Sequence, residues 1–176
     1  QGWRGGHIFC STTTAKLLVH VFKLRRIDLI HAVEIGDTIT ISGAKVTFLD
    51  ANHCPGAVML LFTLDSGKVF LHTGDMRYHP NMKLYPELQN VKIDKVFLDT
   101  TYAHPKHQFR PQAKVIEDII KQVKDFLFAF GDAGLVYLSA YTLGKERVIF
   151  GLQDALGLPI YMDDEKINIM QQIEGG

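Results

Sequence analysis

The chain has 176 residues, nearly half of them hydrophobic, and its 19 basic residues balance 19 acidic ones. It is long enough to bury a core, and its net charge argues neither for nor against nucleic-acid binding, which would have to use local basic clusters such as residues 23–26 or 104–110. No apolar run approaches the roughly 20 residues that span a bilayer, and residues 1–6 are not a signal peptide. Cys10 and Cys54 are too few for a disulfide framework and suggest a reducing compartment.

The first part of the chain has the pattern of short strands with one helix. Residues 7–10 are an apolar run, and Ser11 can cap a helix whose apolar residues recur at helical spacing as far as Leu24. Residues 31–35, 38–41 and 45–49 are β-like and are separated by Gly-Asp and Ser-Gly turns. We therefore expect successive antiparallel strands that form one sheet of a sandwich.

Further strands are predicted at residues 57–63 and 68–71, with a hairpin turn at 65–67 between them. Residues 91–98 alternate and then become fully apolar, which is typical of a half-buried strand that enters a core. Polar residues follow three of the predicted strands: the turn 50–56, the turn 72–75 and Asp99. Each of these strands therefore ends at a potential metal ligand.

Imidazole and carboxylate groups are standard zinc ligands, and a metal that activates water needs several of them to converge from different strand ends. His53 in the first polar turn and Asp75 in the second are candidates. Both residues are also ordinary turn formers, because a His beside Cys-Pro-Gly can cap a turn and an Asp often follows Gly in one. Spacing alone leaves both interpretations open.

Beyond Tyr102 the pattern predicts an α/β unit. Residues 111–130 form an amphipathic helix, and residues 144–156 form a second helix. Apolar runs at 135–138 and 160–162 predict strands on either side of the second helix. The order strand, helix, strand suggests a parallel unit that is distinct from the preceding sandwich.

Two places in the chain could meet a phosphate. Thr142 and Lys145 precede the second predicted helix, where backbone amides, a hydroxyl and an ammonium group can form an anion pocket. The alternative is a capped helix start with Lys145 in solvent. Arg77, two residues after Asp75, can orient that carboxylate or contact a phosphate, and the alternative is a surface ion pair.

Three strings occur in the order LDANHCPGAVMLLF, LHTGDMR and LDTTY. They resemble the DNA cross-link repair nucleases of the β-CASP branch of the metallo-β-lactamase superfamily, and the resemblance runs from about Phe9 to Gly157. It implies that His53 and Asp75 are zinc ligands. It also implies that Asp99 lies at the metal centre as a catalytic residue together with Asp75, and that residues 142–146 hold a substrate phosphate.

The resemblance implies an α/β fold, with a partial metallo-β-lactamase αββα sandwich over residues 1–101 and the start of a β-CASP region over residues 102–176. The His-x-His-x-Asp-His motif of the family is absent from the chain. We therefore expect a fragment of a larger protein that has part of an active site and is inactive by itself.

For the intact protein, the resemblance implies a zinc-dependent 5′-to-3′ exodeoxyribonuclease that acts in the nucleus, in repair of interstrand cross-links and double-strand breaks. Its partner would be DNA, including ends with a 5′-phosphate, and no protein partner follows from the sequence. The alternatives are an inactive β-CASP scaffold or DNA-binding protein, an RNA-processing β-CASP nuclease and a lactamase-like enzyme for small molecules.

Overall fold

The computed structural model describes residue 3 and residues 5–174. It divides into two compact units, one of Gln1–Thr101 with Ile167–Gly176 and one of Tyr102–Lys166. The identity of residues 1–101 and 102–176 as parts of two family domains stays a prediction.

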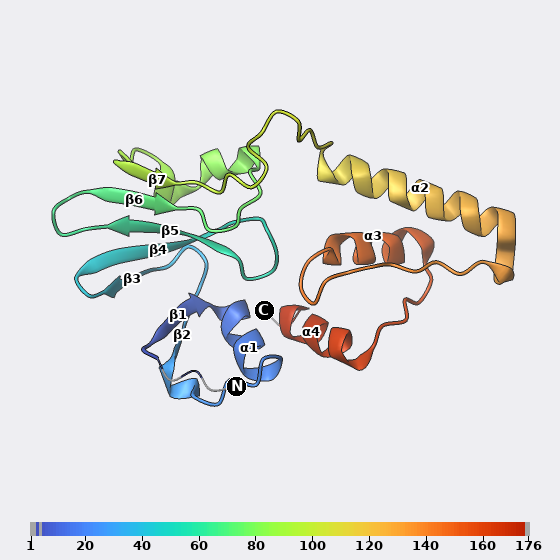
Figure 1. Ribbon diagram of the computed structural model, residues 1–176, viewed down its shortest axis with the longest axis horizontal. Helices are drawn as coiled ribbons and strands as arrows, with labels where there is room; N and C mark the ends of the chain where they lie inside the picture. The colour runs from blue at the N-terminus through green and yellow to red at the C-terminus, as the bar shows by residue number, and fades with distance from the viewer. Residues whose placement is uncertain (1–2, 4, 175–176) are drawn as a thin grey trace. The chain divides into compact units, whose positions relative to one another are not determined.

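The first unit contains a five-stranded sheet with the strand order β3-β4-β5-β6-β7 (Figure 1). Neighbouring strands are antiparallel from β3 to β6, and β7 joins parallel to β6. The strands are β3 (Thr38–Ile41), β4 (Ala44–Asp50), β5 (Val58–Thr63), β6 (Val69–His72) and β7 (Lys95–Phe97). The predicted hairpin between β5 and β6 is therefore confirmed.

Apolar side chains of the central strands pack in two clusters, as the two-residue period of a strand requires. Val46 and Phe48 of β4 pack with Val33. Leu49, the next residue of β4, packs in the other cluster, which includes Met82 from the segment that connects β6 to β7. Burial on both faces fixes the register of β4, because a slip of one residue would exchange the two sets of side chains.

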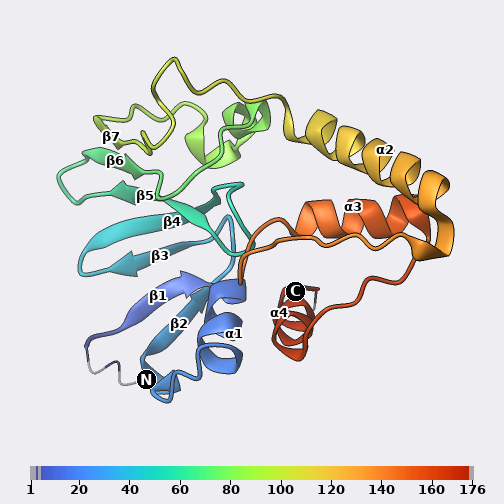
Figure 2. The same ribbon diagram turned by 45° about the vertical axis from the view of Figure 1, so that its right-hand side comes forward.

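A separate two-stranded sheet pairs β1 (Ile8–Ser11) with β2 (Ile30–Val33) in parallel. A parallel pair needs a crossover connection, and α1 (Thr12–His20) lies in this one (Figure 2). Ser11 caps α1 as predicted, since its Oγ accepts a hydrogen bond from the Thr14 N–H at 3.2 Å. The prediction that residues 31–49 form successive antiparallel strands was wrong for β2, which pairs with β1 rather than with β3.

The second unit contains α2 (Gln112–Phe130) and α3 (Glu146–Leu156), which confirm the two predicted helices. A further helix that was not predicted, α4 (Asp164–Glu174), begins in this unit and ends in the first. The predicted strands at 135–138 and 160–162 are absent. Residues 135–138, 160 and 161 instead line an apolar cavity of about 420 Å³ together with side chains of α2 and α3 such as Leu127 and Leu152. Among the described residues, no helix has the length and apolar character needed to cross a membrane.

Candidate active site at one edge of the sheet

Three strands of the five-stranded sheet end at the same edge. β4 and β6 both run antiparallel to β5, and β7 runs parallel to β6, so β4, β6 and β7 point in one direction. His53, Asp75 and Asp99 follow these three strands in turn. The strand directions thus bring the three turns to the same end of the sheet, and Figure 1 shows β5 between β4 and β6, with β7 beyond β6. His53 does not line the pocket that Asp75 and Asp99 share, so the convergence of all three side chains stays a prediction.

Asp75 and Asp99 line one pocket of about 360 Å³. His72, the last residue of β6, also lines this pocket and was not singled out from the sequence. Its ring stacks on Phe97 with 5.6 Å between the ring centroids, and its Nδ1 accepts a hydrogen bond from the Gly74 N–H at 3.0 Å. The available signal was its place at the end of a strand, directly before the turn that holds Asp75.

The Asp99 carboxylate is held by hydrogen bonds from two loops. Its Oδ1 accepts from the Thr101 hydroxyl at 2.7 Å and from the Thr101 N–H at 2.9 Å, and its Oδ2 accepts from the Met76 N–H at 3.2 Å. These bonds, the Thr101 hydroxyl first, lower the pKa of Asp99 below its ordinary value, and the charge of His53 adds a smaller lowering. Asp99 is therefore anionic and electrostatically linked to His53.

Thr73 connects the ends of β6 and β7. It is 2% exposed, its hydroxyl accepts a hydrogen bond from the Asp99 N–H at 2.9 Å, and its own N–H donates to the Phe97 carbonyl at 3.0 Å. The hydroxyl also donates to the Gly74 carbonyl at 3.0 Å. Thr73 thus fixes the backbone segments that carry Asp75 and Asp99.

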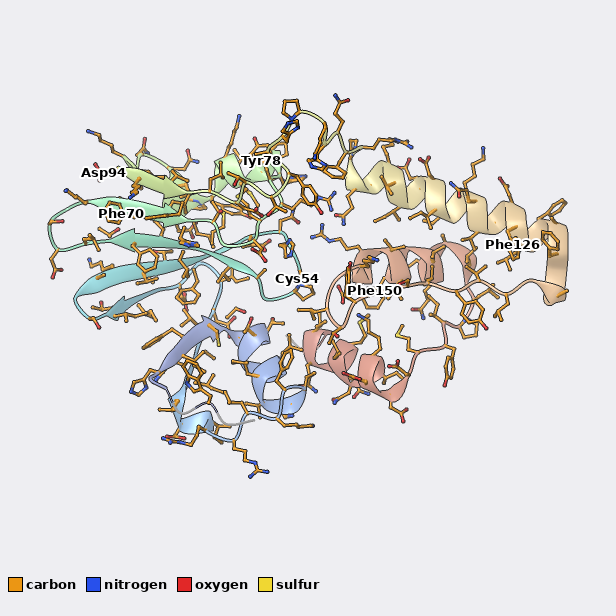
Figure 3. The ribbon with its side chains drawn as sticks, in the orientation of Figure 1. Cys54, Phe70, Tyr78, Asp94, Phe126 and Phe150 are labelled. Atoms are coloured by element: carbon orange, nitrogen blue, oxygen red, sulfur yellow. The ribbon has the colours of Figure 1, made fainter. Side chains whose placement is uncertain are left out.

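The turn that holds His53 is closed by its own backbone. The Ala51 N–H donates to the Ala57 carbonyl at 3.1 Å, and the Ala57 N–H donates to the Cys54 carbonyl at 3.0 Å. The Gly56 carbonyl accepts the hydroxyls of Ser11 and Thr14, at 2.7 and 3.1 Å. The turn is thereby anchored to the start of α1, and Cys54 is labelled on it in Figure 3.

The same turn is tied to the Asp75 loop through Arg77. The Arg77 N–H donates to the Ala51 carbonyl at 3.0 Å, and the Asn52 side chain donates to the Arg77 carbonyl at 3.1 Å. Arg77 is an exposed residue. These contacts place the Arg77 backbone beside the site, and a contact of its side chain with phosphate stays a prediction.

The site fits a metal ion in donor type but not in donor number. His53 and Asp75 supply the imidazole and carboxylate that zinc uses. Over residue 3 and residues 5–174, however, no group of three or more His, Cys, Asp or Glu side chains is placed to hold a metal ion. A catalytic zinc is held by three protein ligands, so the described residues do not complete a site.

β7 differs from its prediction in burial. Residues 91–98 were expected to enter a core, but Val96 is 49% exposed and Leu98 is 59% exposed. β7 is the last strand of its sheet, and among the described residues it has a strand neighbour on one side. Asp99 therefore follows an edge strand, and not a strand enclosed by the core.

Thr142 and Lys145 belong to the second unit. The Lys145 ammonium donates to the Ser139 carbonyl at 3.1 Å and lies 4.8 Å from the centre of the Tyr141 ring. The Gly144 N–H, which an anion pocket at this helix start could use, donates instead to the Glu146 carboxylate at 2.7 Å. Phosphate binding by Thr142 and Lys145 stays a prediction.

The fold is similar to that of a solved protein. A crystal structure of a protein of unknown function from Enterococcus faecalis V583 superposes with a TM-score of 0.65 at 12% identity, over 96% of this chain and 44% of that one. At this identity the similarity concerns the fold alone, and it supports an α/β protein. No protein-family profile matches the chain.

Two curated relatives match most of the chain. The DNA cross-link repair protein SNM1 of Arabidopsis thaliana is 36% identical over 97% of this chain and 35% of its own length. The 5′ exonuclease Apollo of Gallus gallus is 30% identical over 95% of this chain and 35% of its own length. The chain thus spans about a third of each relative. Along nearly all of its residues, the chain is similar in sequence to proteins named for DNA cross-link repair and for 5′ exonuclease activity, which is the resemblance that its motifs indicated.

Proposed function

We propose that this chain is part of a DNA repair nuclease that hydrolyses DNA phosphodiesters at the edge where β4, β6 and β7 end. The observation that supports this most is the shared pocket of Asp75 and Asp99, with the His53 turn at the end of β4, which runs in the same direction as β6 and β7. These residues lie in a sequence related to proteins named for DNA cross-link repair and for 5′ exonuclease activity.

In this proposal, His53 and Asp75 are two of the ligands of a catalytic zinc ion, and the remaining ligands come from residues outside 1–176. When bound, zinc supplies Lewis-acid activation of water and of the scissile phosphate. Asp99 acts as a second carboxylate, which holds the Asp75 loop by accepting the Met76 N–H. Arg77, Thr142 and Lys145 supply positive charge or hydrogen bonds to substrate phosphates.

The finer assignment follows the family resemblance. We propose 5′-to-3′ exonuclease activity on DNA with 5′-phosphate ends, in interstrand cross-link and double-strand break repair in the nucleus. An RNA-processing nuclease, a lactamase-like hydrolase and an inactive scaffold remain the competing functions, and one substrate panel separates them. Cleavage of 5′-phosphorylated DNA, RNA and a β-lactam should be compared in the longer protein that contains these residues.

Asp75→Asn should decrease DNA cleavage by the longer protein by more than about 100-fold. Even partners that only orient metal ligands cost 10- to 100-fold when they are changed, and Asp75 is proposed to bind the metal itself. Asp65→Asn is the matched control, because Asp65 is exposed in the β5–β6 turn, at the opposite edge of the same sheet. Equal activity of the two variants would contradict the assignment, as would cleavage that survives removal of metal by a chelator.

The isolated chain of 176 residues should show little or no nuclease activity. Two protein ligands do not hold a catalytic zinc tightly, and the described residues provide no group of three. Incubation of the purified chain with 5′-phosphorylated DNA and zinc tests this expectation. Robust metal-dependent cleavage would refute the proposal that the remaining zinc ligands lie outside residues 1–176.

A further inference from the structure

Three aromatic rings contact one another on the loop that precedes α2. The Tyr102 ring meets the rings of His107 and Phe109 edge-on, with 5.2 and 5.0 Å between centroids. His107 and Phe109 are parallel within 3°, with centroids 6.2 Å apart. We refer to Tyr102, His107 and Phe109 as the ring cluster.

Two rings of the ring cluster are exposed, and the third, His107, is half-buried. Tyr102 is 63% exposed and Phe109 is 65% exposed. Single exposed apolar side chains are common on protein surfaces. Here, by contrast, a local turn arranges the rings, because the His107 N–H donates to the His104 carbonyl at 2.9 Å and the Lys106 N–H donates to the His104 ring at 3.2 Å. Tyr102 and Phe109 are thus exposed in a defined mutual orientation.

The segment that holds the ring cluster carries two cationic residues. Residues 102–111 include Lys106 and Arg110 and contain no acidic residue. Arg110 forms an exposed ion pair with Asp118 of α2, and the Lys106 side chain is exposed. Aromatic faces beside cations match single-stranded nucleic acid, which offers flat bases on a phosphate backbone.

We propose that the ring cluster is a stacking platform for the bases of single-stranded DNA. The choice of DNA rests on the proposed function, whereas the platform itself rests on the exposure, ring geometry and charge of residues 102–110. Tyr102 follows Asp99 by three residues, so the chain limits the distance between their Cα atoms to about 11 Å, whatever the placement of the two units. That span is about three stacked nucleotides of one strand. A base stacked on Tyr102 would therefore lie within a few nucleotides of the backbone at Asp99.

Binding to two oligonucleotides with equal numbers of phosphates tests the platform. One is a thymidine strand of about ten nucleotides, and the other is an abasic strand of the same length. Fluorescence anisotropy with the whole chain should show tighter binding of the strand that has bases. In the double variant Tyr102→Ala/Phe109→Ala, the affinity for the thymidine strand should fall at least about tenfold for each stacked base that is lost. The affinity for the abasic strand should stay unchanged.

Three further variants make this result specific. Tyr102→Phe keeps the ring and should keep the affinity. Phe128→Ala removes a ring of α2 that is 94% exposed, and it should leave binding unchanged. Lys106→Ala should weaken the binding of both strands equally, and the salt dependence of the binding constant should decrease by the amount expected for about one phosphate contact.

Four outcomes would overturn the proposal. Two concern the unsubstituted chain: no measurable binding of the thymidine strand, or equal binding of the thymidine and abasic strands. The other two are a loss of affinity in Phe128→Ala as large as that in Tyr102→Ala/Phe109→Ala, and tighter binding of RNA than of DNA. Circular dichroism should show that the double variant keeps its fold, and cross-linking of 5-iododeoxyuridine DNA should map to Tyr102 or Phe109. Cleavage is not measured in this experiment, so failure of the nuclease assignment and failure of the platform give separate results.

Discussion

In the first unit, the loops that hold Asp75 and Asp99 are fixed by several hydrogen bonds of the backbone, whereas in the second unit a buried ion pair fixes the turn before α3. In the first unit, the Met76 and Arg77 amides bond to Asp99 and to the Ala51 carbonyl. In the second, the Lys166 ammonium contacts Glu146 Oε1 at 2.9 Å and the carbonyls of Tyr141 and Thr142 at 3.3 Å.

The two arrangements differ in how they respond to substitution. A hydrogen bond between two backbone groups survives most changes of side chain, and two of the loop contacts in the first unit are of this kind, from the Thr73 N–H to the Phe97 carbonyl and from the Arg77 N–H to the Ala51 carbonyl. The ion pair depends on two side chains that are 13% and 7% exposed, and removal of one leaves the other charge buried. The turn of the second unit should therefore be more sensitive to a single substitution than the loops of the first.

Lys166→Met should decrease the free energy of unfolding by about 3–5 kcal/mol, the largest stability effect that we expect. It removes the cation that contacts the Glu146 carboxylate and two carbonyls of the turn. Urea unfolding followed by circular dichroism measures the change. The double variant Lys166→Met/Glu146→Leu should recover much of the loss, because it no longer buries a charge.

Lys114→Met is the matched control for this prediction. Lys114 pairs with Glu117 at 2.8 Å, but these side chains are 61% and 60% exposed. An exposed pair contributes little to stability, so Lys114→Met should leave the unfolding curve nearly unchanged. If Lys166→Met behaved like Lys114→Met, burial would not be what makes the Glu146 pair important.

Gly56→Ala should destabilise the first unit by about 1–2 kcal/mol more than Gly67→Ala. Both glycines have a positive φ, +84° and +78°, so both variants share a similar backbone strain. A Cβ at Gly56 would lie 2.8 Å from Thr14 Oγ1 and 3.1 Å from the Thr14 nitrogen, whereas one at Gly67 meets nothing within 4 Å. The difference between the variants, measured in urea, isolates the contact of the His53 turn with α1. Equal destabilisation would show that Thr14 can move enough to accommodate the added Cβ at position 56.

The predicted elements were most accurate where local patterns decide the structure. The helix predicted at 111–130 is α2 almost to the residue, because its apolar face repeats over many turns. Residues 135–138 and 160–162 were misassigned because a short apolar run fits a strand and equally fits an extended segment packed on helices. The partner of β2 was missed for a related reason, since parallel pairing with β1 depends on a crossover and leaves no turn signal.

For the candidate site, the sequence identified side chains but not the residues that hold them. Asp75 and Asp99 were selected as acidic residues after apolar runs, and the structure brings them to one pocket. Thr73 and Lys166 were not selected. A buried threonine and a lysine in a helix have no local signature, and their roles come from partners that are 26 and 20 residues distant in the chain.

Thr101→Val should raise the pKa of Asp99 toward its ordinary value, a smaller effect than the preceding ones. The Thr101 hydroxyl makes the largest contribution to the lowered pKa, while the bonds from the Thr101 and Met76 amides remain in the variant. Because the folded state favours the carboxylate, its contribution to stability is complete above the unfolded-state pKa and is lost as the pH falls through the folded-state pKa. In the variant, Asp99 should therefore protonate at a higher pH, which carbon-13 NMR of the carboxyl group measures.

His53→Ala provides the comparison for this titration. The charge of His53 is the smallest of the contributions that lower the pKa of Asp99, so its removal should shift the titration less than Thr101→Val does. The reverse order would mean that charge across the two turns, and not local hydrogen bonding, controls Asp99. The first unit would then depend on paired charges as the second does, and the contrast between backbone and ion-pair control would fail at the site itself.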